Sequence, residues 1–276
     1  MTADAHGDVA ALPAGFPAVL VPFVRRPHES ALFLDFDGTL AAIVADPAQA
    51  RPVEGARELL VELARRLGLV AVVSGRPVSF LVDALGRPPG VHLAGLYGME
   101  EVTATGQVRQ DPDAARWAPE VAAATHAAAA TAPPGAAVEH KGLSVTLHWR
   151  QARSAERWAR DTAAAQAEAT GLALQEGRMS VELRPPVAAD KGTVVSRLAP
   201  GHGVVGFVGD DLGDLPAFEV LGRLLDAGVD VARVAVMDAE SAAEVLAAAD
   251  LVVEGPRAAV ELLWVVAGVP GAPGRS

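Results

Sequence analysis

Short runs of apolar residues alternate along the chain with stretches in which apolar residues recur at helical spacing. The runs predict strands buried on both faces of a sheet, at residues 31–35, 69–74, 204–210, 232–236 and 250–253. The helical spacing predicts helices at residues 54–67, 78–85, 214–222, 240–248 and 256–267. Strands that alternate with helices indicate an α/β fold, a doubly wound parallel sheet with helices on both faces.

The middle of the chain has a different pattern. An alanine-rich helix is predicted over 113–131 and ends before Pro133. Alternating residues, another helical stretch and two short runs around a Glu-Gly turn follow, at 136–150, 152–170 and 172–185. This order predicts a small open-faced sheet with helices on one face, an α+β arrangement.

We therefore expect two domains. The core would comprise residues 1–108 and 189–276, and the smaller domain would be inserted between them as residues 109–188. Segments near 101–111 and 185–190 contain Gly, Pro or Asp and are the expected hinges. The pattern leaves open whether the first 29 residues pack as a helix or form a docking segment.

Candidate chemistry begins at LFLDFDGTL, residues 32–40, where a predicted buried strand ends in two aspartates, Asp35 and Asp37. Two like charges so close together are unfavourable unless a positive group lies between them. Ligands of open parallel sheets bind beyond the carboxyl ends of the strands, where the strand order reverses. Three more segments near such ends carry polar residues, namely Ser74-Gly75-Arg76, Lys191 and the GDDLGD run with Asp210 and Asp214.

These residue types suit a metal-dependent phosphoryl transfer. Carboxylate oxygens with few nitrogens and no sulfur are the ligands of a hard cation, so Mg²⁺ is the expected metal. One carboxylate can attack phosphorus to form an aspartyl-phosphate, and a second can act as general acid and base. Asp35 and Asp37 fit these two roles. The other polar residues would bind phosphate oxygens, at Ser74 and Lys191, or complete the metal site, at Asp210 and Asp214.

The same motifs resemble those of the haloacid dehalogenase superfamily, with DFDGT, the Ser of SGR, Lys191 and GDDLGD in order. Three further stretches are similar to the trehalose-6-phosphate phosphatase family, namely GLYGME (95–100), VEHKGLSVTLHWR (138–150) and MSVELRPP (179–186). The resemblance covers roughly residues 30–255. It implies a Rossmann-like core with an inserted C2-type cap domain, and hydrolysis of trehalose 6-phosphate to trehalose and phosphate.

By this resemblance Asp35 is the nucleophile and Asp37 is the general acid/base. Mg²⁺ would be held by Asp35, the backbone carbonyl of Asp37 and Asp210, with Asp214 in support. The fourth motif of the family often reads GDD-x-T-D-E, whereas Gly213 and Leu215 stand here in place of Thr and Glu. Because the aspartates that face the metal in the family are kept, we expect activity to be kept.

The resemblance also places a Glu-x-Lys pair and a second Glu of the inserted domain over the sugar, matching Glu139, Lys141 and Glu182. Glu139 and Lys141 are two residues apart on a predicted strand, so they point to the same face. Carboxylates and charged donors read sugar hydroxyls and reject molecules that lack them. Further candidates for substrate binding are Gly75, Arg76, His148, Arg178 and Arg184.

Several alternatives stay open at this point. The motifs also suit a phosphatase of another sugar phosphate, such as sucrose phosphate or mannosylglycerate phosphate. A phosphomutase would keep the phosphoryl group and need a sugar 1,6-bisphosphate, and a non-catalytic partner of a trehalose-phosphate synthase would not need both Asp35 and Asp37. A Rossmann dehydrogenase is disfavoured, because no G-x-G-x-x-G follows the first predicted strand.

The composition and charge of the chain limit which partners and which cellular location are expected. The 276 residues carry a formal charge of −11, which disfavours nucleic-acid binding, and they include no cysteine. No apolar run approaches the roughly 20 residues of a membrane span, and the N-terminus lacks the order of a signal peptide. We expect a cytoplasmic monomer that binds a small-molecule substrate, and a trehalose-phosphate synthase is the protein partner considered. The sequence has two lysines, Lys141 and Lys191, against 21 arginines, and each lies in one of the two candidate sites.

Overall fold

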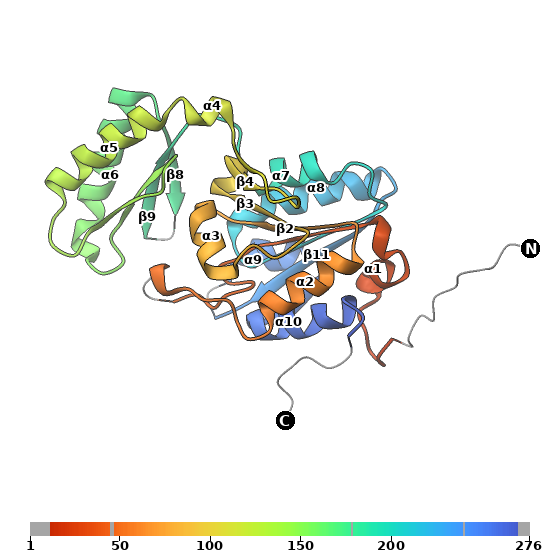
Figure 1. Ribbon diagram of the computed structural model, residues 1–276. Helices are drawn as coiled ribbons and strands as arrows, with labels where there is room; N and C mark the ends of the chain where they lie inside the picture. Colours follow the sequence, from red (N-terminus) through yellow and green to blue (C-terminus); the bar gives the residue numbers. More distant parts are fainter. Residues whose placement is uncertain (1–11, 45–46, 178, 240, 270–276) are drawn as a thin grey trace, which may run out of the picture.

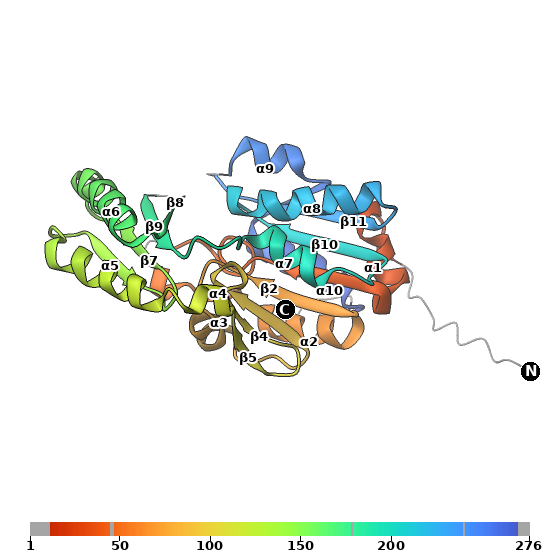
Figure 2. The same cartoon turned by 90° about the horizontal axis from the view of Figure 1, so that it is seen from above.

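The computed structural model describes residues 12–44, 47–177, 179–239 and 241–269. Within these ranges the chain forms one large sheet and one small sheet, each with its own helices (Figure 1). The two parts lie beside each other in both Figure 1 and Figure 2. The predicted fold class, an α/β core with a smaller α+β cap, is confirmed by this arrangement.

Eight strands form the large sheet, in the order β12-β11-β10-β1-β2-β3-β4-β5. Their bounds are β1 (Ser30–Leu34), β2 (Leu69–Val73), β3 (Val91–Gly95), β4 (Glu100–Val102), β5 (Val108–Gln110), β10 (Val204–Gly209), β11 (Asp230–Met237) and β12 (Leu251–Glu254). Neighbours from β12 to β3 are parallel, whereas β4 and β5 are antiparallel at one edge. The chain places β2 and β3 on one side of β1 and β10 on the other, so the strand order reverses between β1 and β10.

Helices cover both faces of the large sheet because the central strands are apolar on both faces. In β1, Leu32 and Leu34 belong to one buried cluster, and Ala31 and Phe33 belong to the other. The first cluster includes side chains of α1 (Val21–Arg25), α2 (Ala56–Arg66), α3 (Val78–Leu85) and α10 (Gly255–Val266). The second includes side chains of α7 (Lys191–Leu198), α8 (Leu215–Asp226) and α9 (Ala243–Ala248).

The segment before β1 packs against the sheet wherever the structure describes it. Leu20 and Phe23 are fully buried in the first cluster. A Cβ added to Gly206 in β10 would lie 2.7 Å from the Phe23 ring, so a glycine there lets α1 approach the strand. Of the two possibilities left open for the first 29 residues, packed helices are found from Ala18 to Arg25, residues 12–17 are turn and loop, and residues 1–11 lie outside the described ranges.

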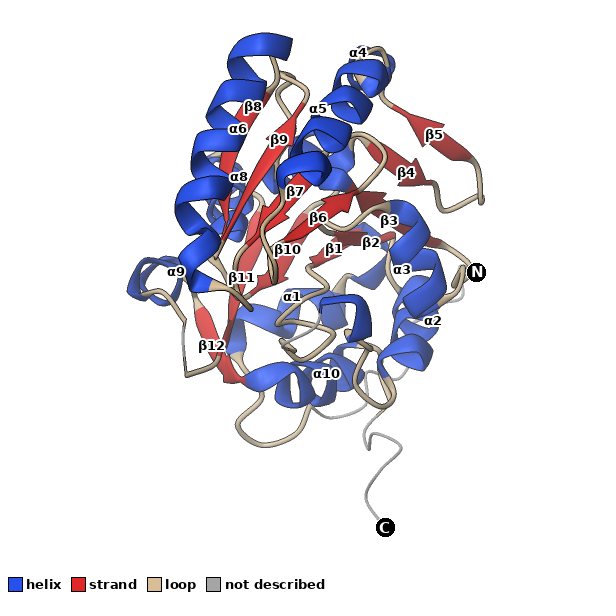
Figure 3. Cartoon of the chain, turned by 90° about the vertical axis from the view of Figure 1, so that its left-hand side faces the viewer, coloured by secondary structure: helices blue, strands red, loops and turns tan. Residues whose placement is uncertain are grey.

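The small sheet is antiparallel and has the order β6-β7-β9-β8. Its strands are β6 (Ala137–His140), β7 (Val145–His148), β8 (Ala173–Gly177) and β9 (Ser180–Arg184). Helices α5 (Ala118–Thr131) and α6 (Glu156–Thr170) lie together on one face of it (Figure 3). In Figure 1 these helices are on the side away from the large sheet, so the opposite face of the small sheet is turned toward the core.

Two details of the connections differ from the expectation. The first expected hinge, residues 101–111, is wrong as a linker, because β4 and β5 form a hairpin at the edge of the large sheet there. The predicted helix over 113–131 is divided into α4 (Pro112–Ala115), capped by the Asp111 side chain, and α5. The domain boundaries at 108/109 and 188/189 stay a prediction.

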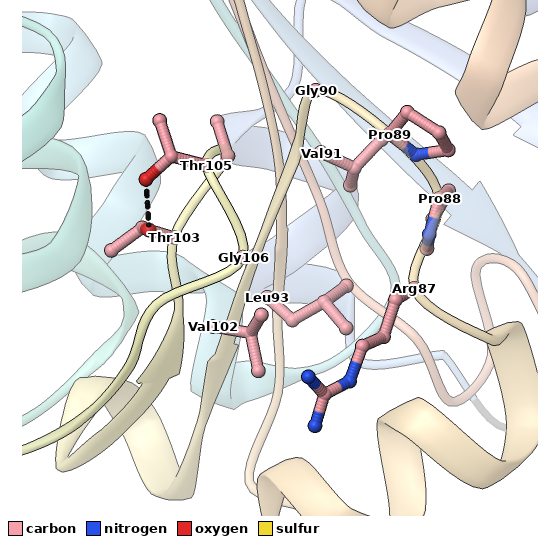
Figure 4. A pocket seen from close by; sticks show the side chains of 11 residues that line it. Arg87, Pro88, Pro89, Gly90, Val91, Leu93, Val102, Thr103, Thr105 and Gly106 are labelled. Carbon is pink, nitrogen blue, oxygen red and sulfur yellow. Dashed lines mark hydrogen bonds between the residues drawn. The ribbon is translucent and has the colours of Figure 1, made fainter.

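Short 3₁₀ helices complete the structure, at Ala18–Leu20, Pro27–Glu29, Pro47–Gln49, Leu96–Gly98, Arg153–Ala155 and Leu212–Asp214. Among the helices in the described ranges, none has the length and apolar character needed to cross a membrane. A cavity of about 250 Å³ lies between the loops around Pro88 and Thr105 (Figure 4). Gly90 and Val91 of this cavity lie at the start of β3, the end of that strand opposite to Gly95.

Candidate active site

The carboxyl ends of β1, β2 and β10 and the start of α7 meet at one edge of the sheet, where the strand order reverses. Asp35 follows β1, and its backbone N–H donates to the carbonyl of Val208 in β10 (2.9 Å), so the strands stay paired up to this residue. Asp210 follows β10, and Ser74 follows β2, the other neighbour of β1. Lys191 is the first residue of α7. The structure thus brings four of the residues singled out from the sequence to one edge of the sheet.

Three carboxylates and one ammonium form the centre of this site. Each of Asp35, Asp210 and Asp214 is buried and offers a carboxylate oxygen, and the three oxygens lie within 4.8 Å of one another. The Nζ of Lys191 is 2.6 Å from Oδ1 of Asp214 and 2.9 Å from Oδ1 of Asp35. Lys191 itself is only 4% exposed. The cluster therefore holds three acidic groups and one basic group largely out of contact with water.

Burial decides the proton affinities in this cluster. It raises the pKa of Asp35 well above the usual range, against the opposing effect of Lys191. Burial likewise raises the pKa of Asp214, and it raises the pKa of Asp210 to about 8. For Lys191, burial disfavours the charge, but the carboxylates of Asp214 and Asp35 outweigh it and raise the pKa well above its ordinary value. The lysine stays protonated, and its one charge leaves the carboxylates under-compensated.

The residues present fit a divalent cation. Oδ1 of Asp210 is buried and has no hydrogen-bond partner among the described residues, as expected of an oxygen that binds a metal. The donors around it are carboxylate oxygens, which favour hard cations such as Mg²⁺ or Ca²⁺. A cation there would also supply the charge that Lys191 alone does not. The cluster of Asp35, Asp210 and Asp214 can therefore bind a metal.

The GDDLGD loop is held by the third aspartate of that run. Oδ2 of Asp214 accepts the backbone N–H groups of Asp210 (2.8 Å) and Asp211 (3.0 Å), while Oδ1 accepts from Lys191. A Cβ on Gly209 would lie 2.3 Å from Cγ of Asp214, so this position requires glycine. Because both of its oxygens are engaged, Asp214 orients the loop and the lysine, whereas Asp210 keeps an oxygen free.

Two residues of this loop depart from the usual family motif. The backbone N–H of Gly213 donates to Oδ1 of Asp211 (2.9 Å), which caps the 3₁₀ turn. Leu215 begins α8 and packs against the second buried cluster. Neither residue adds a charge to the carboxylate cluster.

Asp37 pairs with a different basic residue from Asp35, namely Arg76 in place of Lys191. The guanidinium of Arg76 donates to both of its carboxylate oxygens, from Nε to Oδ2 and from another nitrogen to Oδ1, each at 2.8 Å. The same guanidinium lies 4.5 Å from the ring centre of Phe80, which limits its movement. The two aspartates of DFDGT therefore avoid mutual repulsion because each has its own basic partner. Gly38 follows with a φ of +76°, and a Cβ there would lie 2.0 Å from Oδ2 of Asp210.

The loop after β3 braces the Ser-Gly-Arg segment. Tyr97 donates its backbone N–H to the carbonyl of Ser74 (2.9 Å), and Leu96 donates to the carbonyl of Arg76 (2.8 Å). Both have positive φ, 47° for Leu96 and 59° for Tyr97, which costs energy for residues other than glycine. A Cβ on Gly75 would lie 2.6 Å from the Tyr97 hydroxyl.

Sequence reasoning assigned no role to Tyr97. Burial raises the pKa of its hydroxyl, Glu182 of the small sheet raises this pKa further, and Lys191 of the core lowers it. The hydroxyl of Tyr97 therefore lies near charged groups of both sheets. The Arg184 guanidinium lies 5.1 Å from the ring centre. The signal available in the sequence was the position of the chain's single tyrosine within GLYGME.

The small sheet brings together the three residues expected over the sugar. The Nζ of Lys141 lies 3.7 Å from Oε1 of Glu182 and 4.0 Å from Oε2 of Glu139. Oε2 of Glu139 also pairs with Nε2 of His148 (2.8 Å). Burial disfavours the charge of Glu139, but the hydrogen bond to His148 and the charge of Lys141 lower its pKa overall. Glu182 accepts a hydrogen bond from the Ser144 hydroxyl.

The remaining candidates have other surroundings. Arg184 donates to the side chain of Gln175 and to the carbonyl of Ala189, so it ties β9 to the segment that leads back to the core. Arg178 lies outside the described residues. The charges of Glu139 and Arg76 influence each other's pKa, so the open face of the small sheet and the Ser-Gly-Arg segment are electrostatic neighbours.

Comparison with known proteins agrees with this geometry. Residues 33–250 match the family model described as trehalose-phosphatase. A trehalose-phosphate phosphatase of Mycobacterium avium is 39% identical over 202 residues, which are 69% of this chain and 51% of that protein. One from Mycobacterium leprae is 35% identical over 215 residues, 73% of this chain and 49% of that protein. This chain thus spans about half the length of the curated relatives it matches.

A solved structure shows the same fold. The C-terminal domain of trehalose-6-phosphate phosphatase from C. albicans aligns with a TM-score of 0.75 and 23% identity, covering 94% of this chain and 99% of that one. At this identity the likeness concerns the fold alone. The family model extends over both the carboxylate cluster and the small sheet, and on that match the chain belongs to the trehalose-phosphatase family.

Proposed function

We propose that the chain is a Mg²⁺-dependent phosphatase that hydrolyses trehalose 6-phosphate to trehalose and phosphate through an aspartyl-phosphate. The observation that carries the proposal is the buried contact between Asp35 and Lys191 beside the unpartnered oxygen of Asp210. A nucleophilic carboxylate needs nearby positive charge if it is to meet an anionic phosphate. Family membership supports the choice of substrate.

In the first half of the reaction a carboxylate oxygen of Asp35 attacks phosphorus. The bond between phosphorus and the sugar oxygen breaks, and Asp37 donates a proton to that oxygen, so trehalose leaves and Asp35 carries the phosphoryl group. Lys191 and the hydroxyl of Ser74 would bind phosphate oxygens, and the N-terminus of α7 adds partial positive charge. In the free protein Arg76 orients the side chain of Asp37.

In the second half a water attacks phosphorus. Asp37, now a carboxylate, takes a proton from the water, and the bond between phosphorus and Asp35 breaks. Phosphate leaves, and both aspartates return to their starting protonation states. The same acid/base residue serves both halves, so the cycle consumes one water and no other reactant.

The proposed Mg²⁺ ligands are Asp35, Asp210 and the backbone carbonyl of Asp37, with Asp214 in support. When bound, the cation would neutralise charge on the non-bridging phosphate oxygens. Asp214 contributes through the loop that it orients, because both of its oxygens have partners in the free protein.

The small sheet would read the sugar. One face of the sheet carries two carboxylate acceptors, Glu139 and Glu182, and one ammonium donor, Lys141. The distances between them are long, so sugar hydroxyls can form hydrogen bonds in place of these contacts. Gly75 and Arg76 would complete the substrate site between the two sheets. We further propose that residues 109–188 act as one inserted cap, and that the protein is a cytoplasmic monomer whose substrate a trehalose-phosphate synthase supplies.

Phosphate release from trehalose 6-phosphate tests this proposal. We expect turnover with Mg²⁺, loss of turnover with a chelator, and slower release from glucose 6-phosphate and sucrose 6-phosphate. Asp35→Asn should lower the rate by more than about 10³-fold, because an amide cannot replace the carboxylate that attacks phosphorus. Equal rates for Asp35→Asn and the parent protein would overturn the mechanism, and preference for another sugar phosphate would overturn the substrate.

A further inference from the structure

One buried hydroxyl of the small sheet has no hydrogen-bond partner. Thr146 in β7 is 3% exposed, and its Oγ1 has no partner among the described residues. A buried polar group without a partner lowers stability, so native proteins seldom keep one without a use. The position of this hydroxyl in the sheet indicates what the use is.

Thr146 lies at the centre of the open face. In the sheet register it pairs with Glu139 of β6 on one side and with Glu182 of β9 on the other. The residues before and after it, Val145 and Leu147, belong to the cluster with α5 and α6. Because side chains alternate along a strand, Thr146 points away from the helices, to the face that carries both carboxylates.

The carboxylates around Thr146 each use only one oxygen in their contacts with neighbouring side chains. Glu139 makes its contacts to His148 and Lys141 through Oε2, and Glu182 makes its contacts to Ser144 and Lys141 through Oε1. Lys141 is 3.7 Å from one carboxylate and 4.0 Å from the other, beyond hydrogen-bond distance of either. A sugar hydroxyl can therefore draw these side chains into a new arrangement.

We propose that Thr146 is a positioning residue for sugar recognition, whose hydroxyl donates to one of the two flanking carboxylates, that of Glu139 or of Glu182, once a sugar occupies the face. The hydroxyl is covered in the free protein, so it acts through the carboxylates and not by direct contact with the ligand. In the complex Lys141 turns toward a sugar oxygen and moves away from the two carboxylates. The Thr146 hydroxyl then takes the place of Lys141 as a hydrogen-bond donor to one of them. The inference rests on the proposed sugar-phosphate function and adds a residue that tunes its specificity.

The isosteric variant Thr146→Val separates this role from a structural one. Valine removes the unsatisfied hydroxyl and favours a strand, so the melting temperature should equal or exceed that of the parent protein. At the same time KM for trehalose 6-phosphate should rise about tenfold, because a hydrogen bond to a carboxylate is lost in the complex. Turnover of p-nitrophenyl phosphate, which has no sugar, should not change.

Two further variants complete the experiment. Thr146→Ser keeps the hydroxyl and should restore most of the affinity. Thr125→Val, on α5, removes a hydroxyl that donates to the Val121 carbonyl and serves as the matched control, with an unchanged KM. An unchanged KM in Thr146→Val, or an equal loss with p-nitrophenyl phosphate, would overturn the inference.

Binding measured without turnover distinguishes this inference from the proposed function. Trehalose 6-phosphate is titrated calorimetrically into Asp35→Asn protein with and without Thr146→Val. About tenfold weaker binding in the double variant supports the role of Thr146 even if the parent protein proves inactive on this ester. Equal affinities overturn that role, whereas absence of phosphate release from every sugar phosphate, with binding intact, overturns the proposed function.

Discussion

The two lysines of the chain occupy opposite kinds of surroundings. Lys191 is buried in the core and contacts two carboxylates at 2.6 and 2.9 Å. Lys141, on the small sheet, has a side chain that is 12% exposed and lies 3.7 and 4.0 Å from its two carboxylates. The first geometry fixes a charge in place, whereas the second leaves a charge free to change partners. Under the proposed function, this difference would make the catalytic site preorganised and the sugar site adaptable.

The largest expected effect is that of Lys191→Ala. It would leave Asp35 and Asp214 buried without their cation, which costs about 3–5 kcal/mol of unfolding free energy for a buried pair. Urea unfolding in the presence of a chelator measures this loss, and added Mg²⁺ should restore part of it. A stability within about 1 kcal/mol of the parent protein would show that Lys191 is no more committed than Lys141.

Gly38→Ala tests how rigid the catalytic edge is. Gly38 and Gly86 share a φ of +76°, but a Cβ on Gly38 would meet Asp210 at 2.0 Å, and one on Gly86 would have no neighbour within 4 Å. Both changes should lower stability, because residues other than glycine are strained at positive φ. For Gly86, with φ of 76° and ψ of −156°, this strain should cost about 1–3 kcal/mol. Gly38→Ala alone should also lower kcat, by about 10²-fold, because it displaces Asp210. Equal kcat values for the two variants would mean that the loop around Asp210 can shift to accommodate the new methyl group without loss of activity.

Lys141→Ala should affect recognition and spare stability. Its long contacts predict a change in unfolding free energy below about 1 kcal/mol. We expect KM for trehalose 6-phosphate to rise about tenfold, with normal turnover of p-nitrophenyl phosphate. A melting temperature as low as that of Lys191→Ala would remove the distinction between the two lysines.

His92 gives the smallest expected effect and shows what a buried basic group does when its carboxylate neighbour, Glu101 at 3.4 Å, is shared with an arginine. Burial lowers its pKa to about 4, and Arg197 and Arg109 add to this effect, while Arg197 also pairs with the neighbouring Glu101. Between pH 6.5 and 4 the unfolded chain binds the proton and the folded chain does not, so stability falls as the pH falls through this range. At pH 5.5 the loss should be about 1 kcal/mol relative to pH 7.5.

The variant His92→Gln should flatten this dependence in urea unfolding at the two pH values. Lys191, equally buried, keeps its proton because Asp214 and Asp35 are in contact with it. If His92→Gln kept the full pH dependence of the parent protein, other groups would be responsible for it.

The central strands and the residues gathered at their ends could be predicted from the sequence. Continuous apolar runs identify β1, β2 and β10, and the polar residues after them must meet because parallel strands end at one edge. Strands β4 and β5 escaped prediction because EEV and VRQ are short and mostly polar, and their place at the sheet edge depends on pairing with β3.

The contacts that depend on tertiary structure were beyond the sequence. The pairing of Asp37 with Arg76 joins residues 39 positions apart, and no spacing rule predicts it. The positive φ of Tyr97 is unexpected for a tyrosine, because local preference disfavours it; in the fold Tyr97 donates to Ser74 and its neighbour Leu96 donates to Arg76. The open oxygen of Asp210 likewise became visible only once the partners of Asp214 were known.

The chain returns from the small sheet directly into α7, which begins at Lys191. Strand β9 ends at Arg184 and α7 begins at Lys191, so residues 185–190 are all that separates a sugar-facing strand from the ammonium group. If the proposed cap moves relative to the core, so short a connection would pass the movement to the first turn of α7. Under the proposed function, release of the sugar and release of the phosphate would then be coupled through six residues of backbone.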